Sequence, residues 1–449
     1  MSLLQACFIR VEVKKREFMS RIDLAIEMVN RGVPVVIGEC SDPDVLLKLG
    51  IDKGYFFGKC AQPNLLEIFK PLLDRGWIFG ALDEEGLLPD SSELFARERF
   101  SSTAADTFKD VFFFGEDQKE AFDRIFGPRD SFVVSGNPRT DMWQSNCYNL
   151  YESLIQDIKN KYGDFVLLPL NFACYTNNQK FKDGSETKIR NSSEDLELSF
   201  KAMQDRAEFI FDNLCKLAER LANEEKIKVI MRPHPSDDLK TIKNLMFKHG
   251  VRSNLVQCIS SNEVFPWISA AKILFHNCCS TSLEAAFSGT PVVTFAPSDV
   301  SYLLNDEINN LFPVAKSYED ALGFISNSKY TISSDFKDRV ASWRSLSLEN
   351  SGKTASFIAN RILQRNKFQT PQNFKTYKKS IDFNRLKSEV KGKLASLIGR
   401  RQNRVYLDKF PSTNIEEVIN IVRHIYKHRN YNKLPKVKSI NSRLFSISP

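Results

Sequence analysis

The feature that most constrains the fold is an alternation of short apolar runs with stretches that have apolar residues at helical spacing. Ala6–Val13 predicts a strand, and Glu17–Asn30 follows it with apolar residues four, four and three positions apart, which predicts a helix. Further strands are predicted at Val33–Ile37, Tyr55–Phe57, Trp77–Leu82, Asp110–Phe114 and Ser131–Val134. This alternation is typical of a parallel sheet with helices on both faces.

The same pattern restarts after Tyr151–Gly163. Strands are predicted at Phe165–Leu168, Lys228–Met231, Lys272–Phe275 and Pro291–Phe295, and helices at Leu196–Asn223 and Ser282–Phe287. The 449 residues are too many for one core. The sequence therefore predicts two doubly wound α/β domains, residues 1–155 and 156–365. Ligands of such sheets bind outside the carboxyl ends of the strands.

Residues 366–449 differ in character from the rest of the chain. From Arg365 to the end there are 20 Lys and Arg against five Asp and Glu, a balance of +15, so residues 1–364 carry −7 of the net +8. Asn414–His428 predicts an amphipathic helix, and we expect the rest to be loosely ordered basic sequence without strands. Such a tail suits an anionic membrane surface, nucleic acid or an acidic partner.

Two kinds of signal are missing from the sequence. It has no apolar run of membrane-spanning length, and its N-terminus lacks the apolar region of a secretory signal. The nine cysteines are scattered without a CxxC pair, which predicts neither a metal site nor a disulfide framework. We expect a cytosolic protein with reduced thiols.

The first motif that could carry chemistry is Asp83-Glu84-Glu85-Gly86, at a predicted strand end. Repulsion among three adjacent carboxylates raises at least one pKa. A carboxylate tuned in this way can take a proton from a sugar hydroxyl, or act as a nucleophile at an anomeric carbon. Because side chains alternate along an extended segment, we expect only one of them to face a ligand. The alternative is a solvated acidic turn.

The second motif is Arg232-Pro233-His234-Pro235, where two prolines fix the backbone after a strand. Arg232 offers a bidentate donor for phosphate, and His234 can donate to a phosphate oxygen or protonate a departing one. The alternative is a rigid turn with a surface histidine.

The third motif runs from a strand into a hydroxyl-rich helix start. It contains His276, Asn277, Ser280, Thr281, Ser282 and Glu284. A helix N-terminus offers free N–H groups and a positive dipole end to a phosphate. The three hydroxyls add donors, and Glu284 is placed to reach a ribose hydroxyl. The alternative is a simple serine cap.

A fourth motif, Gly136-Asn137-Pro138-Arg139-Thr140-Asp141, places Asn137 and Arg139 at a helix start. Arg139 could hold an acidic acceptor or the carboxylate of a donor. The alternative is a turn with an arginine on the surface.

In this order the motifs resemble those of bacterial sialyltransferases of the GT-B type, which carry [D/E]-[D/E]-G, H-P and S-[S/T]. Here these are Glu84-Glu85-Gly86, His234-Pro235 and Ser280-Thr281. Bacterial β-Kdo transferases of capsule and O-antigen assembly are similar in donor and fold. The longer strings around Glu84, Asn137 and His234 look like those of bacterial surface carbohydrate biosynthesis proteins. The resemblance covers roughly residues 1–365.

The resemblance implies a GT-B fold, with two Rossmann-like domains facing a cleft and a basic C-terminal extension. It implies that Glu84 is the base for the acceptor hydroxyl, that His234 assists departure of CMP, and that Ser280 and Thr281 hold its phosphate. Asp83 and Glu85 extend the acidic motif and could be the working carboxylate. Ser282 extends the hydroxyl run, so the phosphate register could shift by one.

The implied reaction is transfer of a CMP-activated ulosonic or nonulosonic acid, sialic-acid-like or Kdo, to a glycan or glycolipid acceptor of a capsule or lipopolysaccharide. We expect no metal and no cofactor besides the donor, and no nucleic acid partner. The protein would work in the cytoplasm, at the inner face of the bacterial inner membrane, with the basic tail touching anionic lipid.

Three alternatives stay open. A CDP-glycerol-type polyol phosphate transferase would use the same His234 and Ser280 regions. A UDP-sugar transferase or 2-epimerase would fit Glu284 but not the acidic triplet. The third alternative is not an enzyme but a non-catalytic GT-B scaffold with a membrane- or RNA-binding tail. Inversion or retention cannot be read from one carboxylate.

Overall fold

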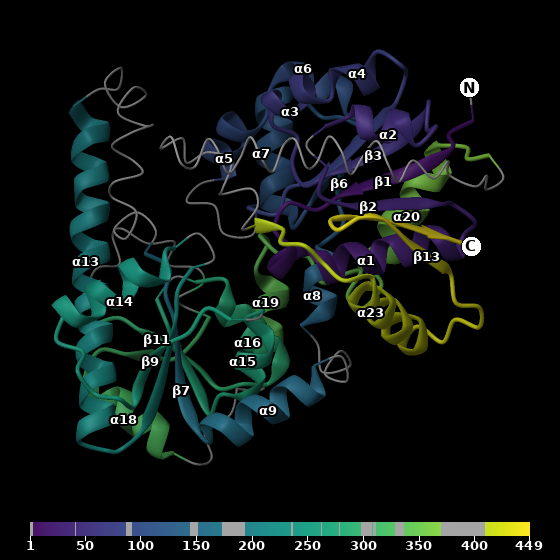
Figure 1. The fold of residues 1–449 in the computed structure, drawn as a ribbon. Coiled ribbons are helices and arrows are strands. Elements are labelled where there is room, and N and C mark those ends of the chain that lie inside the picture. Colours follow the sequence, from purple (N-terminus) through teal and green to yellow (C-terminus); the bar gives the residue numbers. More distant parts are fainter. Residues whose placement is uncertain are drawn as a thin grey trace, which may run out of the picture. The chain divides into compact units, whose positions relative to one another are not determined.

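The computed structural model describes most of the chain. The described ranges are 3–40, 42–86, 92–143, 151–172, 194–234, 237–261, 263–277, 279–297, 308, 311–327, 336–369 and 409–449, with backbone only at 63, 194–203, 337 and 341. They form two compact units, Met1–Leu150 with Ala341–Pro449 (unit 1) and Tyr151–Val340 (unit 2). Figure 1 shows the elements of both. None of the helices in these ranges is both long and apolar enough to cross a membrane.

Unit 1 is built on an eight-stranded sheet with the order β13-β14-β2-β1-β3-β4-β5-β6. Its strands are β1 (Ala6–Arg10), β2 (Val35–Gly38), β3 (Gly54–Gly58), β4 (Ile78–Leu82), β5 (Asp110–Phe113), β6 (Phe132–Val134), β13 (Lys436–Asn441) and β14 (Leu444–Ser448). Neighbours from β2 to β6 are parallel, which confirms the predicted parallel sheet.

The helices of unit 1 follow the predicted alternation with the strands. They are α1 (Lys14–Asn30), α2 (Asp44–Lys48), α3 (Pro63–Ile68), α4 (Lys70–Leu73), α5 (Ser92–Arg99), α6 (Ser102–Thr107), α7 (Glu116–Phe126), α8 (Pro138–Met142), α20 (Thr354–Arg365) and α23 (Ile415–His428). On one face of the sheet, phenylalanine rings such as Phe56 and Phe79 stack with centroids 4.8 Å apart in a large apolar cluster. Helix α1 contacts α8, α20 and α23.

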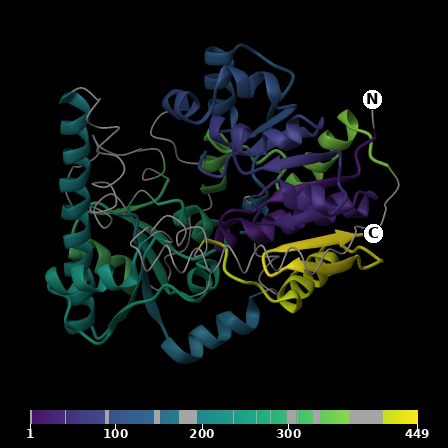
Figure 2. The same cartoon turned by 45° about the horizontal axis from the view of Figure 1, so that its top comes forward.

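The C-terminal segment differs from the predicted strandless tail. The helix predicted there is confirmed as α23, but β13 and β14 form a hairpin, and β14 pairs antiparallel with β2 (Figures 1 and 2). Phe445 and Ile447 of β14 are fully buried. The end of the second domain also differs from the predicted residue 365. After unit 2 the chain returns to unit 1, so α20 and residues 409–449 belong to unit 1.

Buried ion pairs attach α23 and the residues after it to α1. Arg429 donates to both oxygens of Asp23 at 3.1 and 2.6 Å and lies 3.6 Å from Glu27. The Tyr431 hydroxyl donates to Glu27 at 2.8 Å. Asp23 and Glu27 are buried. Because a buried carboxylate needs a partner, these contacts explain why α1 can carry acids on a covered face.

Unit 2 contains a six-stranded parallel sheet with the order β12-β11-β10-β7-β8-β9. Its strands are β7 (Phe165–Pro169), β8 (Lys228–Arg232), β9 (Val256–Cys258), β10 (Ile273–His276), β11 (Val292–Phe295) and β12 (Val314–Ala315). Its helices are α9 (Glu152–Tyr162), α13 (Glu194–Asn223), α14 (Leu239–Lys248), α15 (Phe265–Ala270), α16 (Thr281–Ser288) and α18 (Tyr318–Ser326), and α19 (Phe336–Ser342) lies at the boundary of the units. All four predicted strands are confirmed, whereas β9 and β12 were not predicted.

Each sheet has one point at which the strand order reverses. In unit 1, β1 pairs with β2 on one side and β3 on the other. In unit 2, β7 pairs with β8 on one side and β10 on the other. Ligands of open α/β sheets bind beside the carboxyl ends of strands at such points. In unit 1 these ends lead into Glu12 and Lys59, and in unit 2 into Leu170 and Asn277.

Replacing Arg429 with Met should destabilise the folded protein by roughly 3–5 kcal/mol, because Asp23 and Glu27 would lose a buried counter-charge. Arg423→Met, an exposed arginine in α23, is the matched control and should change stability by no more than about 0.5 kcal/mol. Urea unfolding measures both. Equal free energies of unfolding for the two variants would show that the C-terminal segment is not integral to unit 1.

Candidate functional site

The three acids of the Asp-Glu-Glu triplet point in three directions after β4. Asp83 pairs with Arg99 of α5, Glu84 lies buried against α1 and α8, and Glu85 is exposed beside Arg16. The side chain of Glu84 is 1% exposed, and that of Glu85 is 43% exposed. Of the three carboxylates, Glu85 is therefore the most exposed, and which of them meets a ligand stays a prediction.

Glu84 is enclosed by three donors from two helices. Arg21 Nη2 donates to its Oε1 at 2.7 Å, and Asn137 Nδ2 donates to its Oε2 at 3.2 Å. Arg139 Nη1 lies 3.6 Å from Oε2. Glu84 is thus the point to which α1 and α8 are both attached.

The local sequence explains how these donors are oriented. Asn137 is the N-cap of α8: its Oδ1 accepts from the Arg139 backbone N–H at 2.8 Å, which leaves its Nδ2 for Glu84. Pro138 follows at the first helical position, where its missing N–H costs nothing. The guanidinium of Arg21 lies over the Phe57 ring at 4.6 Å from the centroid. Arg139, predicted to hold a substrate carboxylate, is buried and engaged with Glu84.

The electrostatics keep Glu84 ionised. Burial alone would raise its pKa, but the charges of Arg21, Arg139 and Arg16 outweigh burial, so the pKa lies below its ordinary value. A carboxylate that is buried, ionised and hydrogen-bonded at both oxygens binds a proton weakly. In this geometry Glu84 positions other groups, and its predicted role as the base stays a prediction.

Glu85 has the surroundings of a group that meets a ligand. Its Oε1 lies 2.8 Å from Arg16 and 4.0 Å from Lys59. Burial works to raise its pKa, but Arg16 and Lys59 together bring the pKa below its ordinary value. At neutral pH Glu85 is therefore a partly exposed anion at the carboxyl end of the sheet.

A chain of charges continues from Glu85 to the C-terminal segment. Lys59 lies 2.9 Å from Glu12, and Lys409 donates to the other oxygen of Glu12 at 2.6 Å. Burial opposes the two lysines, which nevertheless lower the pKa of Glu12 to about 2. None of these three residues was predicted from the sequence. The signal for Glu12 and Lys59 was their place just after β1 and β3, whereas nothing in the sequence signalled Lys409.

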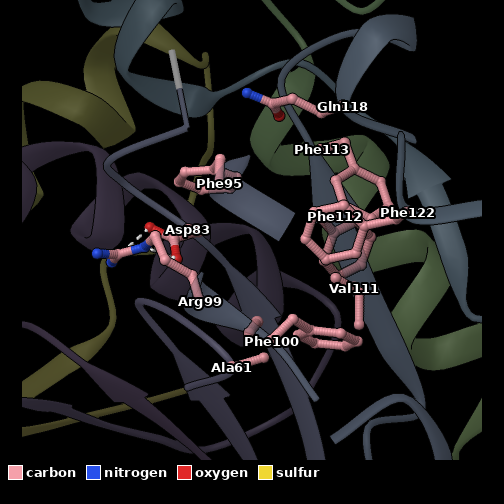
Figure 3. Close-up of a pocket in the computed structure, with 11 residues that line it drawn as sticks. Ala61, Asp83, Phe95, Arg99, Phe100, Val111, Phe112, Phe113, Gln118 and Phe122 are labelled. Carbon is pink, nitrogen blue, oxygen red and sulfur yellow. Dashed lines mark hydrogen bonds and ion pairs between the residues drawn. The ribbon is translucent and has the colours of Figure 1, made fainter. Parts of the chain in front are cut away.

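Asp83 faces the other side of the sheet. Arg99 holds both of its oxygens, at 2.8 and 3.0 Å. Burial raises the pKa of Asp83 despite this pair. Asp83 and Arg99 line a cavity with several phenylalanine rings, shown in Figure 3.

In unit 2, Arg232 ends β8 and is buried. Its Nη1 donates to the Ser261 carbonyl at 2.7 Å, and its guanidinium lies 5.2 Å from the Trp267 ring centroid. Burial lowers its pKa to about 10. These contacts give Arg232 a structural function beside any contact with phosphate.

His234 is half-buried, and its backbone is fixed by Asp237. The His234 N–H donates to Asp237 Oδ2 at 2.9 Å, and the His234 carbonyl accepts from the Asp237 N–H at 2.9 Å. Pro235, which we predicted to stiffen this turn, lies outside the described residues. The turn therefore has a side-chain hydrogen bond that holds its backbone.

The environment of His276 differs from that expected for a nucleotide-binding residue. It is fully buried at the end of β10, where Thr294 Oγ1 lies 3.1 Å from its Nε2 and the Phe312 ring lies 5.2 Å away. Burial lowers its pKa to about 3. His276 is thus a neutral core histidine with no surface open to a ligand.

Asn277 lies at the reversal point of the unit 2 sheet. Its Nδ2 donates to the Phe295 carbonyl at 2.9 Å, which turns its Oδ1 toward Arg206 of α13, whose Nη2 is 3.4 Å away. Arg206 was missed by the sequence analysis, because it comes from a helix far away in the sequence. It adds a cation beside the predicted phosphate-binding helix start.

The hydroxyls at the start of α16 have different environments. Ser282 is buried and donates to the Cys279 carbonyl at 2.7 Å. Thr281 is half-buried and accepts from Cys279 Sγ at 3.2 Å, whereas Ser280 is half-buried and its side chain makes no capping hydrogen bond. Glu284 is buried in the first turn. Ser280 and Thr281 thus keep some exposure, whereas Ser282 is buried, and the binding of a phosphate by the first two stays a prediction.

In the described ranges, no group of three or more His, Cys, Asp and Glu is arranged to hold a metal ion.

Comparisons with known proteins give a likeness in structure only. No family model matches the chain. No curated protein matches it in sequence. The UDP-GlcNAc 2-epimerase of Methanocaldococcus jannaschii, solved with UDP-GlcNAc and UDP, matches with a TM-score of 0.50 and 13% identity, over 80% of this chain and 100% of that chain.

Two other solved structures match at lower scores. MnaA of S. aureus with UDP has a TM-score of 0.49 and 12% identity, over 82% of this chain and 100% of that chain. The wall teichoic acid polymerase TagF has a TM-score of 0.48 and 10% identity, over 80% of this chain and 88% of that chain. The likeness to the M. jannaschii epimerase, together with the two sheets, shows the fold: the chain has the two-unit α/β GT-B fold that the motifs predicted.

Glu84→Gln should destabilise the protein by roughly 3–5 kcal/mol, because Arg21 and Arg139 would stay buried without their anion. The neighbouring Glu85→Gln is the matched control and should cost at most about 1 kcal/mol, since its ion pairs are partly exposed. Urea unfolding of both variants measures the difference. If Glu84→Gln is as stable as the wild type, Glu84 does not hold the site together.

Asp141 gives a prediction about pH. It accepts from the Gly352 and Thr354 backbone N–H groups at 2.7 and 2.9 Å, and burial raises its pKa from 3.8 to about 6. Asp141 therefore binds a proton more tightly in the folded state than in the unfolded state. Its contribution to the stability of the folded protein is lost as pH rises from about 4 to 6.

In Asp141→Asn this dependence should disappear. The stability difference between wild type and variant should shift by roughly 2 kcal/mol between pH 4 and pH 6.5, in favour of the variant at the higher pH. Unfolding curves across this range test it. A constant difference would mean that the pKa of Asp141 is the same in the folded and unfolded states.

Proposed function

We propose that the protein is a glycosyltransferase that transfers a CMP-activated ulosonic or nonulosonic acid to a glycan acceptor of a bacterial surface polysaccharide. The observation that carries the proposal is the division of the acidic triplet. One carboxylate, Glu84, is locked in a buried cage, and the next, Glu85, is exposed where a parallel sheet offers its ligand-binding edge. The motifs that resemble CMP-sugar transferases supply the donor class.

In this proposal the residues of unit 1 activate the acceptor. The oxygen of the acceptor hydroxyl attacks the anomeric carbon of the donor, and Glu85 accepts the proton of that hydroxyl. Arg16 and Lys59 keep Glu85 anionic before the attack, because both lie within 4.0 Å of it. Glu84 orients the segment by holding Arg21, Asn137 and Arg139.

The residues of unit 2 bind the donor and stabilise its leaving group. The bond between the anomeric carbon and the phosphate oxygen breaks, and CMP departs with that electron pair. The N-terminus of α16 favours the anion, and Ser280 and Thr281 offer hydroxyls to it. His234 can donate a proton to the departing phosphate, and Arg206 beside Asn277 adds positive charge.

We further propose that the protein works at the cytoplasmic face of a membrane, to which the basic C-terminal segment binds. Five cations of the described part of this segment are exposed: Arg423, Lys427, Lys433, Lys436 and Lys438. Each contributes about 1 kcal/mol near an anionic lipid surface.

Thermal unfolding with CMP, CDP, UMP and UDP side by side tests the donor class. CMP should raise the melting temperature more than the other three, because a ligand that binds only the folded state stabilises it by about 2.7 kcal/mol at 100 times its Kd. His234→Ala should lose most of this shift. His249→Ala, a histidine of the same unit paired with Asp212, is the control and should keep it.

The other outcomes decide among the alternatives. A preference for CDP or UDP would overturn the CMP-sugar proposal in favour of polyol phosphate transfer or UDP-sugar chemistry. No shift with any nucleotide would leave a non-catalytic scaffold as the explanation of the fold.

A further inference from the structure

An arginine without a counter-charge ends the central strand of the unit 1 sheet. Arg10 is the last residue of β1, the strand at which the strand order reverses. It is only 7% exposed, yet within the described residues its guanidinium forms no hydrogen bond and no ion pair. Arginine is rarely buried in proteins unless it is paired, because a buried charge loses its hydration. The described part of unit 1 therefore lacks an anion that Arg10 could bind.

The neighbouring cations at this edge of the sheet differ from Arg10, because each is paired with a carboxylate. Those that have a carboxylate oxygen at 3.6 Å or less are Arg16, Arg21, Lys59, Arg99, Arg139 and Lys409. The carboxylates of this edge are thus already occupied by other cations. An anion for Arg10 has to come from a ligand.

The surroundings of the guanidinium show where it lies. Side chains alternate along β1, so Arg10 is on the same face as Phe8, which belongs to the large apolar cluster of that face. Its Cζ lies 5.7 Å from the centroid of the Phe69 ring. Burial raises the pKa of the Cys40 thiol to about 12, with Glu39 adding to the rise and Arg10 opposing it. Cys40 is therefore a neutral neighbour of Arg10 and not its counter-ion.

The tip of the Arg10 side chain can be reached from the solvent. Nε is buried and makes no hydrogen bond. Nη1 and Nη2 also make none within the described residues, but they are not among the buried polar atoms, so they hold the exposed part of the guanidinium. These two nitrogens form the fork that binds both oxygens of a carboxylate or a phosphate.

Arg10 lies at the same edge of the sheet as the base of the proposed function. It follows directly after the pair that Ile9 of β1 forms with Phe57 of β3, and Lys59 comes two residues after Phe57. Lys59 Nζ lies 4.0 Å from Glu85. A ligand bound to Arg10 would therefore lie at the reversal point of the sheet, on the edge that also carries Glu85.

We infer that Arg10 binds a carboxylate of the acceptor, so that the acceptor ends in an acidic sugar. This inference rests on the proposed function for the word acceptor, but the binding of an acidic sugar to unit 1 does not. One unpaired guanidinium balances one negative charge, which suits a carboxylate better than a phosphate monoester with its charge of about −2. The reaction would then join one acidic sugar to another.

Binding of simple sugars to the full chain, followed by saturation-transfer NMR titration near neutral pH, tests the inference without any donor. The probes are the methyl glycosides of N-acetylneuraminic acid, Kdo and glucuronic acid, each compared with its own methyl ester, which is similar in shape but uncharged. At least one acid should bind more tightly than its ester, by about tenfold or more, because the ester cannot form the charge-assisted pair. Glucose 6-phosphate, the probe for a phosphate, should bind more weakly than that acid.

Two variants of Arg10 isolate the guanidinium. Arg10→Met keeps an apolar stem beside Phe69 and removes the charge, so the acid should bind no better than its ester. Arg10→Lys keeps the charge and loses the fork, so part of the preference should remain. The matched control is Arg252→Met, because Arg252 also lies over a phenylalanine ring, at 3.6 Å from the centroid of Phe247; this variant should keep the full preference.

The inference is overturned if no acid binds better than its ester, if glucose 6-phosphate binds as well as the best acid, or if Arg10→Met keeps the preference for the acid. Loss of CMP binding in Arg10→Met would also overturn it, because Arg10 would then serve the donor. Failure of the proposed function looks different. If CMP does not stabilise the wild-type protein but an acidic sugar binds through Arg10, the donor assignment falls and the acidic-sugar site stands.

Discussion

The ion pair between Arg21 and Glu84 is the interaction on which the unit 1 site depends. It joins the helix after β1 to the turn after β4, and Asn137 and Arg139 bring in the helix after β6. Three segments that are far apart in sequence thus meet on one buried carboxylate. The charge is tolerated in the interior because it is matched by two guanidinium groups and an amide, and it would be costly without them.

The fixed position of Glu84 determines what its neighbours can do. Successive side chains of an extended segment diverge, so anchoring Glu84 on the α1 side turns Asp83 toward α5 and leaves Glu85 exposed. The triplet therefore combines a buried anchor with an exposed carboxylate, and on our account Glu85 is the base. The charge chain through Lys59 and Glu12 to Lys409 ties the same region to the C-terminal segment.

The sequence predicted the fold well because its signals are local. Buried parallel strands such as β1 and β7 are short apolar runs, and α13 has a long helical apolar pattern. The C-terminal hairpin was not predicted, because Lys436 and Lys438 place charges on an edge strand and hide its pattern. The sequence of β14 can be recognised as a strand only when its pairing with β2 is known.

The site was predicted in part, for the same reason. The motifs located the strand ends correctly, but residue types alone could not tell an anchor from an accessible group. Glu84 and His276 were expected to meet substrates and prove to be buried, whereas Arg21, Lys59 and Arg206 were overlooked. Burial depends on segments that come from elsewhere in the chain, such as helix α8 beside Glu84 and the bend at Phe312 beside His276.

The central claim is that Glu85 promotes cleavage of a CMP-activated acid sugar, and release of CMP tests it most directly. CMP-N-acetylneuraminic acid and CMP-Kdo would be incubated with the protein, a glycan acceptor and no added metal, and CMP release followed by ³¹P NMR. The account predicts that CMP appears from at least one donor faster than without protein, and that Glu85→Gln abolishes this while remaining folded. Intact donors with the wild-type protein, or undiminished release by Glu85→Gln, would contradict it.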